Sequence, residues 1–409
     1  MAKIRPFEAV RPQPQLAKQV ASKPYDVLNS SEAKIEAVGN EYSFLHITKS
    51  EIGLPDTVDI HSAEVYELAF NNLTAFIQRD VLFKESKPCY YIYQLIMDGR
   101  AQTGLVCISS IDDYNNNIIK KHEFTRPEKE LDRINHIKTT GAQTGNVFLA
   151  YRHQASIDTL IDKWKTNKTP IYDFTADDGI QHTLWAVSDE TVIEQITHLF
   201  ETEVPCTYIA DGHHRAASAA KVLLALQEEK ISPYFLTTLF PSNQLQIMDY
   251  NRVVKDLNGH TVDAFIAALS NQFEVSICDT AYKPKALHHF GMYIHQTWYS
   301  LIAKPGTYND EDPIGVLDVT ILQNNILATL LNIQDQRTDK RIDFVGGIRG
   351  LSELEKRVDS GEMSVAFSLY PVTIDQLFNI ADAGEVMPPK STWFEPKLRD
   401  GLLTHLIHV

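Results

Sequence analysis

Residues 207–220 read Thr-Tyr-Ile-Ala-Asp-Gly-His-His-Arg-Ala-Ala-Ser-Ala-Ala, and this stretch decides the fold. Its apolar start predicts a short buried strand. A turn follows at Asp211 and Gly212, where glycine permits a backbone conformation with positive φ. The small residues after Arg215 predict a helix that packs closely on its surroundings and continues to Gln227. We therefore expect a strand–turn–helix unit at this point in the chain.

The turn has the composition of an anion-binding site. The start of a helix presents free N–H groups and the positive end of the helix dipole. His213, His214 and Arg215 add donor and cationic groups there, which suits a phosphate or another oxyanion. The alternative is that Asp211 only caps the helix and the two histidines pack. A metal site made by both histidines is not expected, because adjacent side chains rarely point at one ion.

The length and net charge of the chain exclude some classes of protein. The 409 residues exceed one ordinary domain, and a hydrophobic share of 44% is enough for a sizeable core. A net charge of −15 argues against nucleic acid as a partner. No apolar run could span a bilayer and the N-terminus has no apolar signal core, so we expect a cytoplasmic protein without a membrane partner. The oligomeric state stays open.

Predicted helices and hairpins alternate along the chain, which is typical of the α+β class. Examples are a helix over 62–81, a hairpin around Asp98-Gly99 and a helix beginning at Pro127. We place a boundary that divides the chain into residues 1–255 and 256–409, and we expect the second region to be α+β as well and to close on the site. The Asp249–Arg252 stretch and the triplet Gln102–Gly104 are expected to form turns.

A second chemistry-bearing segment covers residues 120–133, where Lys, His, Arg and Glu alternate. A carboxylate beside cationic groups, as at Glu123, could act as a general base toward a hydroxyl. The alternative is a solvated charged helix face, which is the usual meaning of such runs.

A third segment offers Lys390, Ser391 and Thr392, with Lys397 further on, after two adjacent prolines. A stiff loop with a lysine and two hydroxyls could bind an anion, and an exposed tail loop is the alternative. No P-loop, dinucleotide glycine fingerprint, kinase catalytic loop or nucleophile elbow is present in the sequence.

At the Asp211–Arg215 turn the chain resembles the ParB/sulfiredoxin-like superfamily, and within it free serine kinase, whose turn is also Asp-Gly-His-His-Arg. His122-Glu123 followed by Lys129-Glu130-Leu131-Asp132 is similar to a second motif of that kinase. The resemblance implies a small α+β core that binds a nucleotide or phosphate, here with large insertions. It also implies that Glu123 is the catalytic base.

Nearly the whole chain is similar to the uncharacterised bacterial DUF 1015 family. The hallmarks are Lys23-Pro24-Tyr25-Asp26-Val27, His122-Glu123-Phe124-Thr125, the Asp211–Arg215 turn, and Met387-Pro388-Pro389-Lys390-Ser391-Thr392. This family carries no firm activity, so the likeness does not decide the function.

The leading hypothesis is a phosphotransferase that acts on a small hydroxyl metabolite, with free L-serine and O-phosphoserine as the pair implied by the resemblance. The donor is ATP, ADP or pyrophosphate, with Mg²⁺. The catalytic residues would be Glu123, His213 and Asp211, and Asp211 would orient a histidine or hold the metal. Residues predicted to bind substrate or phosphate are Gly212, His214, Arg215, His122, Thr125, Arg126, Lys129, Arg133, Lys390, Ser391 and Thr392.

Two alternatives belong to other classes. One is a regulator that binds a nucleotide or an amino acid without turnover, and it would have no need of a carboxylate at Glu123. The other is DNA binding in the ParB manner, which the net charge of −15 opposes.

Overall fold

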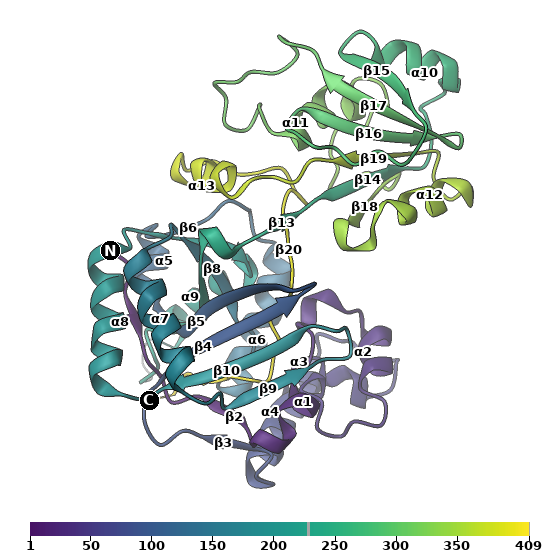
Figure 1. Cartoon of the computed structure of the whole chain (residues 1–409). Coiled ribbons are helices and arrows are strands. Elements are labelled where there is room, and N and C mark those ends of the chain that lie inside the picture. The colour runs from purple at the N-terminus through teal and green to yellow at the C-terminus, as the bar shows by residue number, and fades with distance from the viewer. Residues whose placement is uncertain (227–229, 409) are drawn as a thin grey trace. The chain divides into compact units, whose positions relative to one another are not determined.

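The computed structural model describes residues 1–226 and 230–408, which form two compact units (Figure 1). The first unit comprises Met1–Leu245 and the chain from Pro396 onward, and the second is Gln246–Glu395. Both units mix helices and sheets, so the α+β class is confirmed. The division expected at residue 255 differs from this one, because the C-terminal segment, residues 396–408, returns to the first unit.

The first unit is built on a nine-stranded sheet. β11 lies beside β6, and β8 beside β12, in parallel, while the other pairs are antiparallel. The order along the sheet is β6 (Ile119–Lys120), β11 (Thr207–Asp211), β8 (Val147–Tyr151), β12 (Tyr234–Pro241), β5 (Arg100–Ser110), β4 (Tyr90–Met97), β10 (Gln181–Val187) and β9 (Tyr172–Thr175), with β1 (Ile4–Arg5) also on β5.

Helices on one face of this sheet close an apolar core, which joins strand residues to Ile157, Ile196 and Ala216. Figure 1 shows α7 and α8 along this sheet. The helices of the first unit are α1 (Ala17–Val20), α2 (Ser30–Glu36), α3 (Leu45–Thr48), α4 (Ala63–Gln78), α5 (Ile111–Asn115), α6 (Pro127–Thr140), α7 (Ala155–Asn167), α8 (Glu190–Glu203) and α9 (His213–Ala225).

Local sequence explains where these elements begin and turn. Asp98 and Gly99, with φ of 52° and 77°, make the tight turn that joins β4 to β5. Pro127 occupies the first turn of α6, and Gly141, with φ of 65°, ends it. The predicted turn at Gln102–Gly104 is wrong, because these residues lie inside β5. Gly104 is required there because a Cβ would lie 2.8 Å from the Phe240 ring.

The decisive stretch forms the predicted strand–turn–helix unit. Gly212 takes the left-handed conformation, with φ of 96°, between β11 and α9. The small residues from Ala216 to Ala220 are buried, which lets α9 lie close to the sheet and to α6. The helix ends at Ala225, and the predicted end at Gln227 lies outside the described residues.

The C-terminal segment is attached to the first unit at several points. The backbones of Ser22 and Asp400 exchange two hydrogen bonds, and those of Val10 and Thr404 do the same. Next along the chain, β21 (His405–Leu406) pairs with β7 (Ala142–Gln143). A smaller ribbon of β2 (Val10–Pro12) and β3 (Leu82–Lys84) lies in the same unit. These pairings explain why the last residues do not belong to the second unit.

The second unit has a six-stranded antiparallel sheet of its own. The predicted turn at Asp249–Arg252 is wrong, because Asn251 and Arg252 are fully buried within β14. The sheet order is β15 (Phe273–Cys278), β17 (Thr297–Ala303), β16 (His289–Ile294), β19 (Val365–Leu369), β14 (Tyr250–Val254) and β18 (Ile342–Gly346). The other elements are α10 (Val262–Leu269), α11 (Asp318–Leu322), α12 (Leu351–Asp359), α13 (Ile374–Asp382) and the ribbon of β13 (Ile247–Met248) with β20 (Trp393–Phe394).

Among the residues that the structure describes, every helix is too short or too polar to cross a membrane.

Candidate functional site

Two parallel strands bring the first two chemistry-bearing segments together. β6 lies beside β11, with Lys120 opposite Tyr208. Parallel strands end at the same edge of a sheet. His122 and Glu123, which follow β6, therefore reach the turn that follows β11. The juxtaposition of these segments, separated by about ninety residues in sequence, is the main feature of the site.

His213 lies between the two segments. Its ring packs edge-on against the ring of His122, with centroids 4.5 Å apart. The backbone N–H of His122 donates to Nε2 of His213 at 3.5 Å, the long limit of a hydrogen bond. On the opposite side of the ring, Nδ1 lies 3.7 Å from Oε2 of Glu123. The Glu123 side chain is 48% exposed, so this carboxylate lies against a buried imidazole and also faces solvent.

Both histidines are neutral at physiological pH. Burial lowers the pKa of His122 to about 4. Burial also lowers the pKa of His213 well below its ordinary value, and the adjacent His122 lowers it further. Since Nε2 of His213 accepts a hydrogen bond, we assign its proton to Nδ1, which then points at Glu123. A neutral imidazole can thus orient the Glu123 carboxylate.

Asp211 is held between two cations. Its Oδ1 lies 3.6 Å from a terminal nitrogen of Arg215, and its Oδ2 accepts from Nζ of Lys397 at 3.4 Å. Burial alone would raise the pKa of Asp211, but Lys397 and Arg215 together hold it well below its ordinary value. Asp211 is therefore an ionised carboxylate beside two positive charges.

Arg215 is buried under the turn. It donates to the backbone carbonyl of Asn146 and, at 3.2 Å, to Oδ2 of Asp26. Burial would lower its pKa, but Asp26 and Asp211 raise it instead, so the guanidinium stays charged. Within the described part of the chain, its Nε is buried without a hydrogen-bond partner. A Cβ on Gly212 would lie 3.1 Å from that atom, so any other residue would force the guanidinium to shift.

Other predicted site residues lie near the start of α6, where they contact each other or α6. His214 accepts from the backbone N–H of Arg126 at 2.9 Å, which ties the start of α9 to the start of α6. Burial lowers the pKa of His214, and the charge of exposed Lys129 lowers it further. The Thr125 side chain interacts with the Glu130 carboxylate and helps to lower its pKa.

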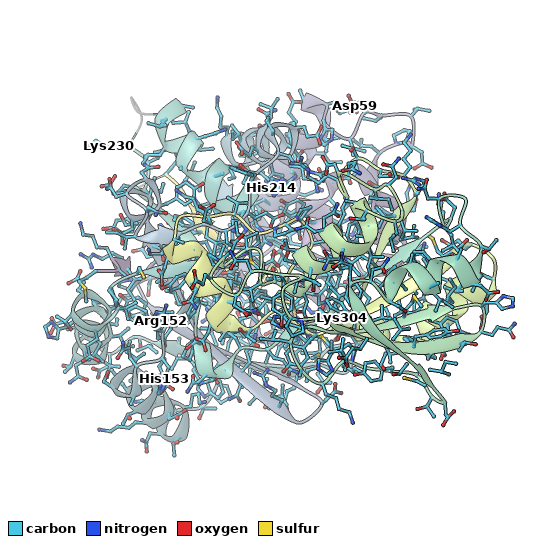
Figure 2. All side chains as sticks on the ribbon, turned by 90° about the horizontal axis from the view of Figure 1, so that it is seen from above. Asp59, Arg152, His153, His214, Lys230 and Lys304 are labelled. Atoms are coloured by element: carbon cyan, nitrogen blue, oxygen red, sulfur yellow. The ribbon has the colours of Figure 1, made fainter. Side chains whose placement is uncertain are left out.

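Arg133 is already engaged within the first unit. Its Nε donates to Asp132 at 2.7 Å, and its guanidinium stacks 4.0 Å from the centre of the Tyr25 ring. These contacts favour a packing role over the predicted role in binding substrate. Arg152 and His153, which follow β8, lie well away from His214 (Figure 2).

The predicted loop residues Lys390, Ser391 and Thr392 lie in the second unit, between α13 and β20. Lys390 takes a left-handed conformation, with φ of 59°, and its carbonyl accepts from buried Arg252 at 3.0 Å. The Ser391 hydroxyl donates to the carbonyl of Pro388 at 2.6 Å. The expectation that this region closes on the site stays a prediction.

Sequence reasoning missed Asp26 and Asp400 and treated Lys397 only as part of a loop. Asp26 was part of the Lys23–Val27 hallmark, so that motif was the available signal for its contact with Arg215. Lys397 and Asp400 follow the second unit in the chain, and no local pattern indicates that they return to the turn. The structure places Gly145 beside both Arg215 and Asp400, because a Cβ on Gly145 would contact both side chains. The sequence around Gly145 does not indicate this.

The described residues contain no group of three or more His, Cys, Asp or Glu side chains that could hold a metal ion by itself. Mg²⁺ commonly uses one or two carboxylates and completes its shell with substrate phosphates and water. Asp211, with one third of its side chain exposed, fits that pattern only together with a bound phosphate. The arrangement can thus bind a phosphate, neutralise its charge and offer a carboxylate to a hydroxyl.

Comparisons with solved structures returned distant likenesses. A conserved hypothetical protein from Pyrococcus furiosus is 16% identical, with a TM-score of 0.35, over 73% of this chain and 94% of that one. A free serine kinase in complex with AMP is 14% identical, with a TM-score of 0.36, over 75% and 91%. SbnI with a C-terminal truncation, from Staphylococcus aureus, is 12% identical, with a TM-score of 0.32, over 74% and 87%.

A comparison with curated proteins returned no match. A protein family matches residues 4–320, which is more than half of the chain and includes both segments of the site. The chain therefore belongs to the family described as "Protein of unknown function (DUF1015)".

Proposed function

We propose that this protein is a phosphotransferase acting on a small hydroxyl metabolite, with free L-serine as the acceptor and O-phosphoserine as the product. The observation that carries the proposal is the position of Glu123, 3.7 Å from the Nδ1 of buried His213 at the start of α9. The likeness of the Asp211–Arg215 turn to that of free serine kinase motivates the choice of serine.

In the proposed reaction the acceptor oxygen attacks the terminal phosphorus of the donor while the bond from that phosphorus to the leaving phosphate oxygen breaks. Glu123 takes the hydroxyl proton, and the leaving group departs with the negative charge. His213 orients Glu123 through Nδ1. The free N–H groups at the start of α9 and the Arg215 guanidinium bind the phosphoryl oxygens.

Mg²⁺ would be held by Asp211 together with the donor phosphates, and it would neutralise part of their charge. The donor is ATP, ADP or pyrophosphate, since the turn provides groups for phosphates without a choice of nucleoside. The reverse reaction, transfer from phosphoserine, would use the same groups.

The test is phosphorus NMR of the purified protein with Mg²⁺ and L-serine, offered ATP, ADP and pyrophosphate in separate samples. We expect a phosphoserine signal with one donor, lost in Glu123→Gln and strongly reduced in His213→Ala. His153→Ala is the matched control, because His153 lies well away from His214 (Figure 2) and should keep full activity.

One result would favour a binding regulator over a phosphotransferase. In that result no donor gives phosphoserine, while nucleotide still raises the thermal stability of both the wild type and Glu123→Gln. A regulator has no use for the carboxylate, whereas transfer depends on it.

A further inference from the structure

The C-terminal segment carries two cations that reach different parts of the first unit. Lys397 reaches the turn, where its Nζ lies 3.4 Å from Oδ2 of Asp211. Arg399, two residues later, reaches the hairpin of β9 and β10. The segment comes after the second unit in the chain, so these two cations lie far in sequence from the groups that they contact.

Arg399 anchors the segment through a buried polar network. Its guanidinium donates to Oδ2 of Asp178 and, at 3.4 Å, to Nε2 of His182. Its backbone N–H donates to the Tyr93 hydroxyl at 3.3 Å, and that hydroxyl lies 2.7 Å from Nδ1 of His182. Burial lowers the pKa of His182 to about 3, so the ring is neutral and can accept from Arg399.

This anchoring fixes the backbone on the C-terminal side of Lys397. Leu398 is buried, and Asp400 exchanges backbone hydrogen bonds with Ser22. The Lys397 side chain is 21% exposed and carries its charge on a flexible four-carbon stem. This flexible stem lets the ammonium change its partner while the backbone stays in place.

The pair between Lys397 and Asp211 is a loose one. Charge-assisted hydrogen bonds of this kind are usually about 2.7–2.9 Å long, and Asp211 lies farther than that from both Lys397 and Arg215. A phosphoryl group with two negative charges at the start of α9 would attract the ammonium more strongly than one carboxylate does.

We propose that Lys397 is a further phosphate-binding residue of this site, and that its ammonium leaves Asp211 for an oxygen of the bound phosphoryl group. Arg399 is the positioning residue that holds Lys397 in reach. This inference rests on the proposed function for its phosphate ligand, but not on turnover. The exchange changes no covalent bond, and it releases the Asp211 carboxylate for Mg²⁺ at the moment the donor arrives.

The test is isothermal titration of the full chain with pyrophosphate, without serine, so that binding is measured apart from transfer. Lys397→Met should weaken pyrophosphate binding by about 10–100-fold, the loss typical of one hydrogen bond to a charged group. Lys397→Arg should stay within about threefold of the wild type, because it keeps the charge. Lys163→Met, an exposed lysine of α7, is the control and should bind as the wild type does.

A double-mutant cycle tests Arg399. Arg399→Lys should weaken pyrophosphate binding on its own but add nothing in the Lys397→Met background, because it acts through Lys397. Equal losses in both backgrounds would limit Arg399 to a structural role.

The proposal is overturned if Lys397→Met binds pyrophosphate within twofold of the wild type, or if the wild type binds none at millimolar concentration. Failure of phosphoserine formation with normal, Lys397-dependent pyrophosphate binding would instead reject the transfer reaction and leave this inference standing.

Discussion

At the scale of single residues, the site depends on burial as much as on charge. His213 is neutral because it is buried, and neutrality lets its Nδ1–H face Glu123 instead of repelling the neighbouring cations. Asp211 is partly exposed, and Lys397 and Arg215 on either side of it hold its pKa well below the ordinary value although desolvation acts in the opposite direction.

Asp400 allows a prediction about stability and pH. It is buried beside Arg215, and in the described structure its Oδ2 has no hydrogen-bond partner. Burial raises its pKa to about 7, although Arg215 lowers it in part. Between the ordinary pKa of an unfolded aspartate, about 4, and 7, the folded state holds a proton that the unfolded state has lost, so stability falls as pH rises through that window.

Asp400→Asn removes this penalty. We expect its melting temperature to exceed that of the wild type by a few degrees at pH 8, corresponding to about 1–3 kcal/mol, and the difference to vanish near pH 4. Thermal unfolding followed by circular dichroism from pH 4 to 8 measures it. Asp177→Asn, at an almost fully exposed position, should follow the wild type at every pH. A variant less stable than the wild type at pH 8 would mean instead that the attraction between the Asp400 carboxylate and Arg215 outweighs the cost of burying the charge.

At the scale of elements, the turn between β11 and α9 requires glycine for two separate reasons. Gly212 has φ of 96°, and an added Cβ would crowd the Arg215 guanidinium at 3.1 Å and the Val147 Cα at 3.4 Å. Gly99, in the β4–β5 turn, has φ of 77° and open space around it. A substitution at Gly99 therefore tests backbone strain alone, whereas one at Gly212 tests strain together with displacement of Arg215.

We expect Gly99→Ala to cost about 1–2 kcal/mol of unfolding free energy through strain alone and to leave pyrophosphate binding unchanged. Gly212→Ala should cost more, and it should also weaken pyrophosphate binding because Arg215 must move. Denaturant unfolding and titration of both variants provide the comparison. Equal binding by the two variants would show that Arg215 does not depend on the turn.

Elements were predictable from sequence where the cause is local. The β4–β5 hairpin follows from Asp98-Gly99, α6 begins at its proline, and the turn before α9 follows from Gly212. The two stretches read as turns, Gln102–Gly104 and Asp249–Arg252, instead contribute to strands, because backbone pairing outweighs their polar local pattern. Arg252, for example, is buried in β14 by bonding to Gln336 and Lys390. Local patterns carry no information about such partners.

At the scale of the molecule, the same reason limits what the sequence reveals about the site. Glu123 and the Asp211–Arg215 turn were predicted together through a resemblance, and β6 and β11 supply the physical reason for their proximity. The contacts of Lys397 and Asp400 with the turn were not predicted, because the chain forms the second unit between them and the turn. Their place depends on the pairing of the C-terminal segment with Ser22, Val10 and β7.

The two units can be separated at one ribbon. Met248 and Trp393 are paired antiparallel in β13 and β20, so an Asn-Gly turn between them could replace residues 249–392. The first unit has its own core, so we expect this variant to unfold in one cooperative thermal transition. It should also bind pyrophosphate as the full chain does, because Arg215, Lys397 and the start of α9 all remain. Titration calorimetry with pyrophosphate compares the shortened variant with the full chain and with full-length Lys390→Ala. A folded variant that has lost pyrophosphate binding, matched by a loss in Lys390→Ala, would show instead that the loop of the second unit belongs to the donor site.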